Sequence, residues 1–319
     1  MPQSTPEDIH LLLQVAQDYY DHGLTQLQIS RKLGSSRSTV SRALQTARDI
    51  GLVEITIHRD WLNYNQLEQQ LKAHFKLKQV RILPTGHADI LDELGKLAAA
   101  SVDAHIRDGM ILGMSYGRSL AATIQHIRPQ PKQNINVVQL IGALGSHNPL
   151  IEGLDLSRNL ANKYGGSYRY LYAPLLVEDS RTRDLLTSEN LVQDVLEIGK
   201  QADVALLGIG ALASNVSSLI WTGYLNQKEL TKLQQQGAAG HMCAQFYDDD
   251  GRVMDIPFNT RTISIGLDAL KQIDTVIVVA GTKEKSRAIL GALRGGYIDV
   301  LITDEAAAQG IMERLSTSE

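Results

Sequence analysis

The chain has 319 residues, of which 43% are hydrophobic and 21% are charged, and its formal net charge is −4. This length exceeds the usual size of one hydrophobic core, so we expect about two domains. The composition is typical of a soluble globular protein. The net charge gives no sign of nucleic-acid binding, so a local cluster of basic residues matters more than the total.

The cysteine count and the N-terminal pattern indicate the compartment. Cys243 is the single cysteine, which excludes an intrachain disulfide and favours a reducing cytoplasm. The first residues lack a signal-peptide pattern, and no apolar run approaches the roughly 20 residues of a membrane span. We therefore expect a cytoplasmic protein with no membrane partner. The nine histidines show no metal-ligand spacing, so we expect neither a metal nor a cofactor.

The first 60 residues carry the pattern of a helix-turn-helix followed by a β wing. Apolar residues at helical spacing predict a first helix over residues 9–20, and Gly23 suits the left-handed position after it. Val53, Ile55 and Ile57 alternate with polar residues, which predicts the wing strand. The residues expected to face the small core from the second and third helices are Leu27, Ile29, Leu33, Val40, Ala43 and Leu44.

Polar residues mark the start of the second and third helices. Thr25 fits the N-cap of the second helix, and Gln28 completes a capping-box pair. Gly34 closes this helix, and Ser35 or Ser36 caps the third. The second helix of a helix-turn-helix pair enters the DNA major groove.

The third predicted helix presents short polar and arginine side chains that suit base edges and phosphates. Basic residues also recur in a stretch without Asp or Glu, namely Arg31, Lys32, Arg37, Arg42 and Arg48. An ordinary solvated helix is the alternative, but the order of helix, turn, serine cap, helix and wing favours DNA binding. The residues expected to contact DNA are Gln26, Ser36, Arg37, Ser38, Thr39, Ser41 and Arg42.

A second domain follows the predicted wing. Leu62, Leu67, Leu71 and Phe75 recur at roughly helical intervals, which predicts an amphipathic linker helix over residues 59–78. This helix could pair subunits or pack on its own domain. We therefore expect a winged helix-turn-helix domain at 1–58 and a second domain at 59–319.

From residue 80 onward, short apolar runs alternate with helical patterns. This alternation predicts an α/β fold with a doubly wound, mostly parallel sheet and helices on both faces. The predicted strands are 80–83, 110–113, 135–141, 168–171, 204–209, 275–279 and 299–302. The predicted helices are 89–106, 118–127, 150–164, two within 180–199, and 284–293.

Four glycine-bearing loops follow predicted strands, at residues 113–119, 142–145, 208–212 and 281–285. Ligands of open α/β sheets bind beyond the carboxyl ends of the strands, so the four loops could open on one crevice. In the first loop Ser115 offers a hydroxyl, Gly117 allows close approach and Arg118 offers charge. The free amides at the start of the next helix suit an anion. The alternative is a tight turn in which Ser115 is only an N-cap.

Three further features bear on this crevice. Lys283 and Lys285 begin a predicted helix, where the helix dipole disfavours cations unless they bind an anion; the alternative is two solvent-exposed lysines. His241 precedes an apolar strand and can be structural or functional. The aspartate run at 248–251 lacks the ligand spacing of a calcium loop, so we predict a β-turn.

Motifs along nearly the whole chain occur in a family-specific order. The N-terminal motifs are Tyr19, Tyr20, residues 24–26, Ile29, 33–34, 36–37, 40–42 and Gly51. The later motifs are residues 113–118, 203–210, 240–241, 246–248, 285–289, 294–298 and 301–304. Together these motifs resemble the SorC family of bacterial sugar-responsive transcription regulators.

The resemblance implies a helix-turn-helix joined to a domain related to sugar-phosphate isomerases and deaminases, with a sugar or sugar phosphate in the crevice. Residues 115–118 would take the phosphate position. The chain departs from the family where His241 replaces a frequent acidic residue and where Tyr116 replaces a second Ser or Thr. The residues that the resemblance assigns to effector binding are Ser115, Tyr116, Gly117, Arg118, Ser119, Gly142, Ala143, His241 and Lys285.

The sequence thus predicts a DNA-binding transcriptional regulator of carbohydrate metabolism genes whose operator affinity is controlled by a sugar or sugar phosphate. A homo-oligomer, either a dimer or a tetramer, would read paired half-sites. The alternative is a sugar-phosphate isomerase or deaminase, which needs a converging acid and base. Only His241, Asp248 and Asp304 are candidates, and the ligand loops contain no carboxylate pair. We therefore expect no enzymatic activity and no catalytic residue.

Overall fold

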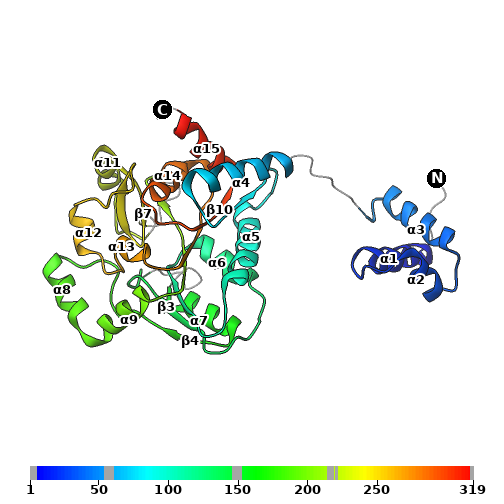
Figure 1. Ribbon diagram of the computed structural model, residues 1–319, viewed down its shortest axis with the longest axis horizontal. Helices are drawn as coiled ribbons and strands as arrows, with labels where there is room; N and C mark the ends of the chain where they lie inside the picture. The colour runs from blue at the N-terminus through cyan, green and yellow to red at the C-terminus, as the bar shows by residue number, and fades with distance from the viewer. Residues whose placement is uncertain (1–5, 54–60, 146–152, 214–218, 220–221, 317–319) are drawn as a thin grey trace. The chain divides into compact units, whose positions relative to one another are not determined.

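The computed structural model describes residues 6–53, 61–145, 153–213, 219 and 222–316. The chain divides into two compact units, residues 1–61 and residues 62–319 (Figure 1). Each unit has a hydrophobic core of its own. No helix among the described residues is long and apolar enough to cross a membrane.

The described part of the N-terminal unit, residues 6–53, contains three helices around a small core. They are α1 (Pro6–Tyr20), α2 (Gln26–Lys32) and α3 (Arg37–Asp49). The core is formed by Val15, Ile29, Val40 and Leu44, with Leu24, Leu33 and Ala43 packed against it. The helix-turn-helix predicted from the sequence is therefore present.

The predicted caps fix where α2 and α3 begin. The Thr25 Oγ1 atom accepts a hydrogen bond from the Gln28 amide at 3.3 Å, and the Thr25 amide donates to Gln28 Oε1 at 2.9 Å. This reciprocal pair is the predicted capping box. Of the two serines considered for α3, Ser36 is the cap, since its Oγ atom accepts from the Thr39 amide at 3.1 Å.

The predicted first helix is present and begins at Pro6, before the predicted start at residue 9. One expectation for this unit was wrong. Leu27, expected in the core, is 49% exposed. Because α2 has only seven residues, it buries one narrow stripe around Ile29, and a residue two positions earlier lies off that stripe. The predicted wing strand through Ile55 and Ile57 lies outside the described residues.

The second unit is built on a seven-stranded parallel sheet, in the order β1-β10-β9-β5-β2-β3-β4. Its strands are β1 (Gln79–Leu83), β2 (Ile111–Met114), β3 (Asn136–Gln139), β4 (Ser167–Arg169), β5 (Val204–Leu207), β9 (Thr275–Val279) and β10 (Val300–Asp304). Each strand overlaps one predicted from an apolar run. The doubly wound, mostly parallel sheet predicted from the sequence is confirmed.

Helices precede, connect and follow these strands (Figure 1). Those in the first half of the unit are α4 (Trp61–Phe75), α5 (Ile90–His105), α6 (Arg118–His126), α7 (Gly153–Tyr164), α8 (Ser180–Ser188) and α9 (Asn190–Lys200). Later ones are α11 (Gln227–Gln235), α12 (Pro257–Arg261), α13 (Leu267–Leu270), the 3-10 turn η2 (Lys283–Lys285), α14 (Ser286–Arg294) and α15 (Glu305–Ser316). The predicted linker helix corresponds to α4.

The side chains of the sheet alternate between two hydrophobic clusters. Along β9, Val276 and Val278 belong to one cluster, whereas Ile277 and Val279 belong to the other. Because successive side chains of a strand point to opposite faces, the sheet is buried on both sides. This double burial explains why the strands read as continuous apolar runs in the sequence.

A second, smaller sheet was not predicted. It is antiparallel and contains β6 (Gly210–Ala211), β7 (Ala238–Met242) and β8 (Gln245–Asp248). The strand expected after His241 is β8, whereas His241 itself lies within β7, which was not predicted. The strands are short and contain glycine and polar residues, so their periodicity is weak. The helices α12, α13 and α15 were also missed.

Asp304 joins the end of β10 to two other segments. Its Oδ1 atom accepts a hydrogen bond from the Ala307 amide at 2.8 Å, at the start of α15. Its Oδ2 atom accepts from the Thr282 amide at 2.6 Å, in the loop after β9. Thr282 has a φ of +83°, which is uncommon for a β-branched residue. The Asp304 carboxylate therefore helps to hold the loop in this conformation.

We predict that Asp304→Ala destabilises the second unit by about 2–4 kcal/mol, because two amides lose their carboxylate acceptor. Asp304→Asn keeps one carbonyl oxygen and should cost about half as much. The free energy of unfolding, measured in urea, checks both values. Equal stability of Asp304→Ala and the unsubstituted chain would contradict the structural role of this carboxylate.

Candidate functional site

A pocket of about 380 Å³ lies at the carboxyl ends of three central strands. All four predicted loops contribute to its lining. The lining residues are 115–119 after β2, Leu144 after β3, 208–210 after β5, and Gly281, Thr282 and Lys285 after β9. This is where an open parallel sheet binds its ligands. We name this cavity the effector pocket.

The loop after β2 places several predicted residues in the effector pocket. Ser115 is buried, and its Oγ atom lies 3.5 Å from the Gly208 amide that donates to it. The N-cap of α6 is Gly117, with a φ of +134° and no side-chain hydrogen bond to the helix. Ser115 is therefore not the cap of α6, and the first amides of this helix can face a ligand. Arg118 and Ser119 line the pocket from the first turn of α6.

Gly142 and Ala143 do not line the effector pocket, contrary to expectation. Gly142 is packed on the chain, since a Cβ atom there would lie 2.3 Å from the Pro174 carbonyl oxygen. Ala143 exchanges main-chain hydrogen bonds of 2.8 Å with Ala173 and Leu175. The Tyr116 hydroxyl donates to the Gly142 carbonyl at 3.2 Å. Gly142 and Ala143 thus lie behind the residues that line the pocket and pack against residues 173–175.

The same loop contributes apolar neighbours of Gly142 instead. Ile141 and Leu144 line the effector pocket. A glycine-rich pattern after a strand correctly predicted a loop near the site. It could not predict which residues of the loop face inward, because this depends on the packing against residues 173–175.

Lys285 lies in a positively charged part of the effector pocket. Burial, and then the nearby charge of Arg118, lower the pKa of Lys285 to about 8, while Asp304 acts in the opposite direction. Arg118 and Lys285 both line the pocket, and no Asp or Glu does so among the described residues. Lys283, by contrast, is exposed and lies 3.7 Å from a Glu313 carboxylate oxygen. Of the two lysines in the turn, only Lys285 faces the pocket.

His241 is buried at the wall of the effector pocket, and its Nε2 atom has no hydrogen-bond partner. Burial and then the charge of Lys285 lower the pKa of His241 to about 4, so the imidazole is neutral at pH 7. A Cβ atom on Gly210 would lie only 1.9 Å from His241 Nε2, so a larger residue there would force the imidazole to move. A buried polar atom without a partner is uncommon and fits a group that meets a ligand.

Several pocket residues were missed because they are apolar. Ile90, Leu91 and Leu94 line the effector pocket from the first turns of α5, and Cys243 and Ala244 line it from the turn between β7 and β8. The Ile90 and Leu91 side chains are 44% and 37% exposed. Apolar residues at the start of an amphipathic helix look like ordinary core residues in the sequence, so no signal distinguishes them.

The predicted DNA-contact residues occupy the start of α3 and the residues around it. Six of them are exposed, namely Ser36, Arg37, Ser38, Thr39, Ser41 and Arg42, whereas Gln26 is half-buried on α2. The Arg42 Nε atom donates to the Ser38 carbonyl at 3.4 Å. Lys32, part of the basic stretch, instead lies 2.8 and 2.9 Å from the two carboxylate oxygens of the buried Asp18.

Other kinds of site find no support among the described residues. No group of three or more His, Cys, Asp or Glu residues there could hold a metal ion. The aspartate run at 248–251 forms a turn, in which the Gly251 amide donates to the Asp248 carbonyl at 3.0 Å. The β-turn predicted for this segment is confirmed.

Residues 59–313 match the Sugar-bind family, which describes a sugar-binding domain. The deoxyribonucleoside regulator of Bacillus subtilis (strain 168) is 30% identical over 312 residues, covering 97% of this chain and 99% of the relative. The sorbitol operon regulator of Klebsiella pneumoniae is 31% identical over 312 residues, covering 96% of this chain and 99% of the relative.

The transcriptional regulator LsrR of Escherichia coli O9:H4 (strain HS) is 33% identical over 302 residues, with 93% of each chain covered. The fold also agrees with a solved relative. The crystal structure of the full-length sorbitol operon regulator SorC from Klebsiella pneumoniae superimposes with a TM-score of 0.82 at 30% identity, covering 96% of this chain and 99% of that chain. The chain therefore belongs to the SorC family of transcriptional regulators and carries the family's sugar-binding domain.

Proposed function

We propose that this chain regulates transcription of carbohydrate-related genes by binding operator DNA through α3 and an anionic carbohydrate derivative, such as a sugar phosphate, in the effector pocket. One observation carries the choice of ligand. Arg118 and Lys285 line the pocket, and no acidic residue lines it among those that the structure describes. Two cations close together in a partly buried site repel one another, and an anionic ligand relieves this repulsion.

The remaining contacts suit the carbohydrate part of such a ligand. The partnerless Nε2 atom of neutral His241 can accept or donate one hydrogen bond to a hydroxyl, depending on its tautomer. The amides at the start of α6 can meet phosphate oxygens. The Ile90 and Leu91 side chains can cover apolar parts of the ligand. This arrangement resembles a small-molecule site with few polar groups in an apolar wall.

A regulator is favoured over a sugar-phosphate isomerase or deaminase. Such an enzyme needs an acid and a base beside the substrate. Of the candidates, Asp304 already accepts hydrogen bonds from two main-chain amides, and Asp248 holds its own turn by accepting from the Asp250 and Arg252 amides. Of these three candidates, only His241 lines the pocket. The relatives are also named as regulators, including those of a sorbitol operon and of deoxyribonucleosides.

The DNA-binding unit is proposed to act as a pair. A single helix such as α3 reads only a few base pairs, and dimers read two half-sites about one helical turn or a multiple apart. We therefore propose a homo-oligomer, either a dimer or a tetramer. A ligand that binds one arrangement of this oligomer more tightly than another would change its affinity for DNA.

We predict that the affinity for a sugar phosphate falls as the pH rises through about 8, the pKa of Lys285. Below this pH the lysine is charged and attracts the anion; above it the free protein must take up a proton to do so. Isothermal titration calorimetry between pH 6.5 and 9.5, with a panel of pentose and hexose phosphates, measures this dependence.

Two substitutions of Lys285 separate charge from other effects. Lys285→Arg should remove the loss of affinity above pH 8, since arginine stays charged. Lys285→Met should weaken binding at least about tenfold at pH 7, because a charged hydrogen bond is lost. Wild-type affinity in Lys285→Met would contradict the assignment of this lysine to the ligand.

We also predict that Arg37→Ala and Arg42→Ala each weaken binding to the DNA upstream of the chain's own gene about fivefold or more, through lost phosphate or base contacts. Fluorescence anisotropy at several salt concentrations measures this binding. Arg107→Ala, in the second unit, is the matched control and should bind like the unsubstituted chain. If both α3 variants behave like the control, the recognition role of α3 is wrong.

A further inference from the structure

The effector pocket combines side chains from two elements that meet at α14. His241 and Gly210 belong to the small antiparallel sheet, whereas Lys285 belongs to η2, the turn that leads directly into α14. The charge of Lys285 lowers the pKa of His241, so these side chains interact. The position of α14 on the small sheet therefore contributes to how Lys285 lies relative to His241, together with the hydrogen bond from the Lys285 amide to the Thr282 carbonyl at 3.0 Å.

Buried contacts pack α14 on this sheet, and two of them involve Ala288. A Cβ atom on Gly240, next to His241, would lie 2.4 Å from the Ala288 Cβ atom. The hydroxyl of the buried Tyr247 donates to the Ala288 carbonyl at 2.9 Å. Both contacts involve Ala288, the third residue of α14. The first residue of α14, Ser286, is buried against α15, since a Cβ atom on Gly310 would lie 2.4 Å from Ser286 Oγ. The start of α14, next to Lys285, is therefore held on the side of α15, and a further contact holds it on the side of the small sheet.

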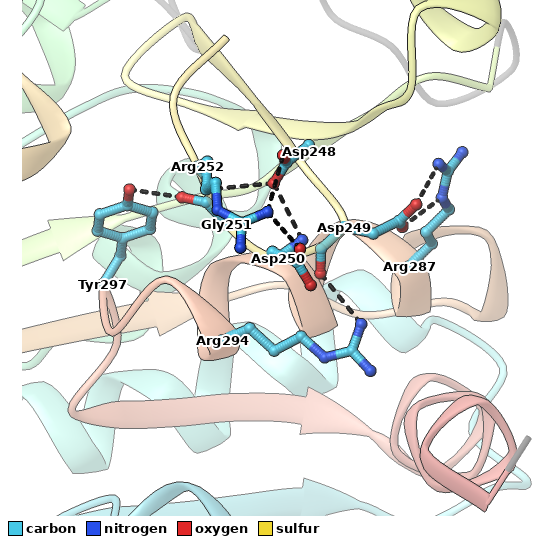
Figure 2. Close-up of polar contacts among 8 residues, drawn as sticks. All are labelled: Asp248, Asp249, Asp250, Gly251, Arg252, Arg287, Arg294 and Tyr297. Atoms are coloured by element: carbon cyan, nitrogen blue, oxygen red, sulfur yellow. Dashed lines mark hydrogen bonds and ion pairs between the residues drawn. The ribbon is translucent and has the colours of Figure 1, made fainter. Parts of the chain in front are cut away.

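A further contact of α14 is an ion pair with the turn after β8, shown in Figure 2. Asp249 accepts a hydrogen bond from Arg287 Nε at 2.7 Å and another from Arg287 Nη2 at 2.6 Å. Arg294 Nη1 donates to the main-chain oxygen of Asp249 at 3.1 Å. The hydrogen bonds from Arg287 are the main cause that lowers the pKa of Asp249. Two parallel hydrogen bonds restrict the orientation of both side chains.

The turn that presents Asp249 is itself held in place (Figure 2). Asp248 Oδ1 accepts hydrogen bonds from the Asp250 amide at 3.0 Å and the Arg252 amide at 2.8 Å. The buried Tyr297 hydroxyl donates to the Gly251 carbonyl at 2.6 Å. A Cβ atom on Gly251 would lie 2.4 Å from α14 and the residue after it, so the turn packs directly on this helix. The turn therefore provides a fixed support for Arg287.

We propose that the Asp249–Arg287 ion pair is a positioning contact of the effector pocket, which holds the first turn of α14 so that Lys285 stays beside His241 and Arg118. Arg287 is the second residue of α14. It lies two residues after Lys285 and one residue before Ala288. The pair acts through Lys285 and touches no ligand itself. The effect of the ion pair on ligand affinity rests on the proposed function. Its effect on the position of Lys285 does not.

The test removes the ion pair without changing the net charge, through the double variant Asp249→Asn with Arg287→Gln. The matched control is Asp250→Asn with Arg252→Gln, which removes an ion pair of the same turn that does not reach α14. NMR titration of the full chain with isotope-labelled lysine measures the pKa of Lys285. The Lys285→Arg variant identifies its signal.

The pKa of Lys285 should rise from about 8 toward its ordinary value in the Asp249–Arg287 variant, because a loosened turn exposes the lysine to water. It should stay unchanged in the control. Binding of inorganic phosphate should weaken about two- to fivefold in the first variant only, since a partly exposed ion pair contributes modestly. Restoration of both properties by the exchanged pair, Asp249→Arg with Arg287→Asp, would support a positioning role.

An unchanged pKa of Lys285 in the Asp249–Arg287 variant would overturn the inference. An equal rise in the control would overturn it as well, because the effect would then be a general loosening of the turn. Failure of the unsubstituted chain to bind phosphate or sugar phosphates would count against the proposed function alone. The pKa of Lys285 would still decide whether the ion pair positions it.

Discussion

The proposed sensing role depends on two positive charges that meet in a partly buried pocket. Arg118 and Lys285 come from helix starts after two different strands, and their mutual repulsion contributes to a lowered pKa for Lys285. Folding thus brings together charges that disfavour one another. Such an arrangement is stabilised when an anion binds, because the ligand removes the repulsion and gains two favourable interactions. We propose that this repulsion is the physical basis of the ligand response.

The fold produces this site through the topology of the parallel sheet. The carboxyl ends of β2, β5 and β9 lie side by side because these strands are sheet neighbours, β5 between the other two. Their loops deliver Ser115, Gly208 and Lys285 to one place. The small antiparallel sheet adds His241, and its packing on α14 links the two sides of the pocket. Ala288 and Asp249, which contribute to the packing of α14, lie outside the pocket.

Much of this organisation could be predicted from the sequence, for physical reasons. Strands buried on both faces, such as β9, read as unbroken apolar runs, and the capping box at Thr25 is a local pattern. Prediction failed where long-range packing decides. Gly142 follows a strand like the other loop glycines, yet it packs against Pro174. The β6–β8 sheet has too little periodicity, and the Asp249–Arg287 pair joins residues far apart in the chain.

DNA affinity with and without ligand, measured in one experiment, tests most directly whether the charge of Lys285 mediates the response to a sugar phosphate. Fluorescence anisotropy with labelled upstream DNA is recorded for the unsubstituted chain and for Lys285→Met, each with sugar phosphates and with the matching unphosphorylated sugars. A phosphorylated sugar should change the DNA affinity of the unsubstituted chain about tenfold. The Lys285→Met variant should bind DNA but lose this response. A full response in Lys285→Met, or a response to unphosphorylated sugars alone, would contradict the role of the Lys285 charge.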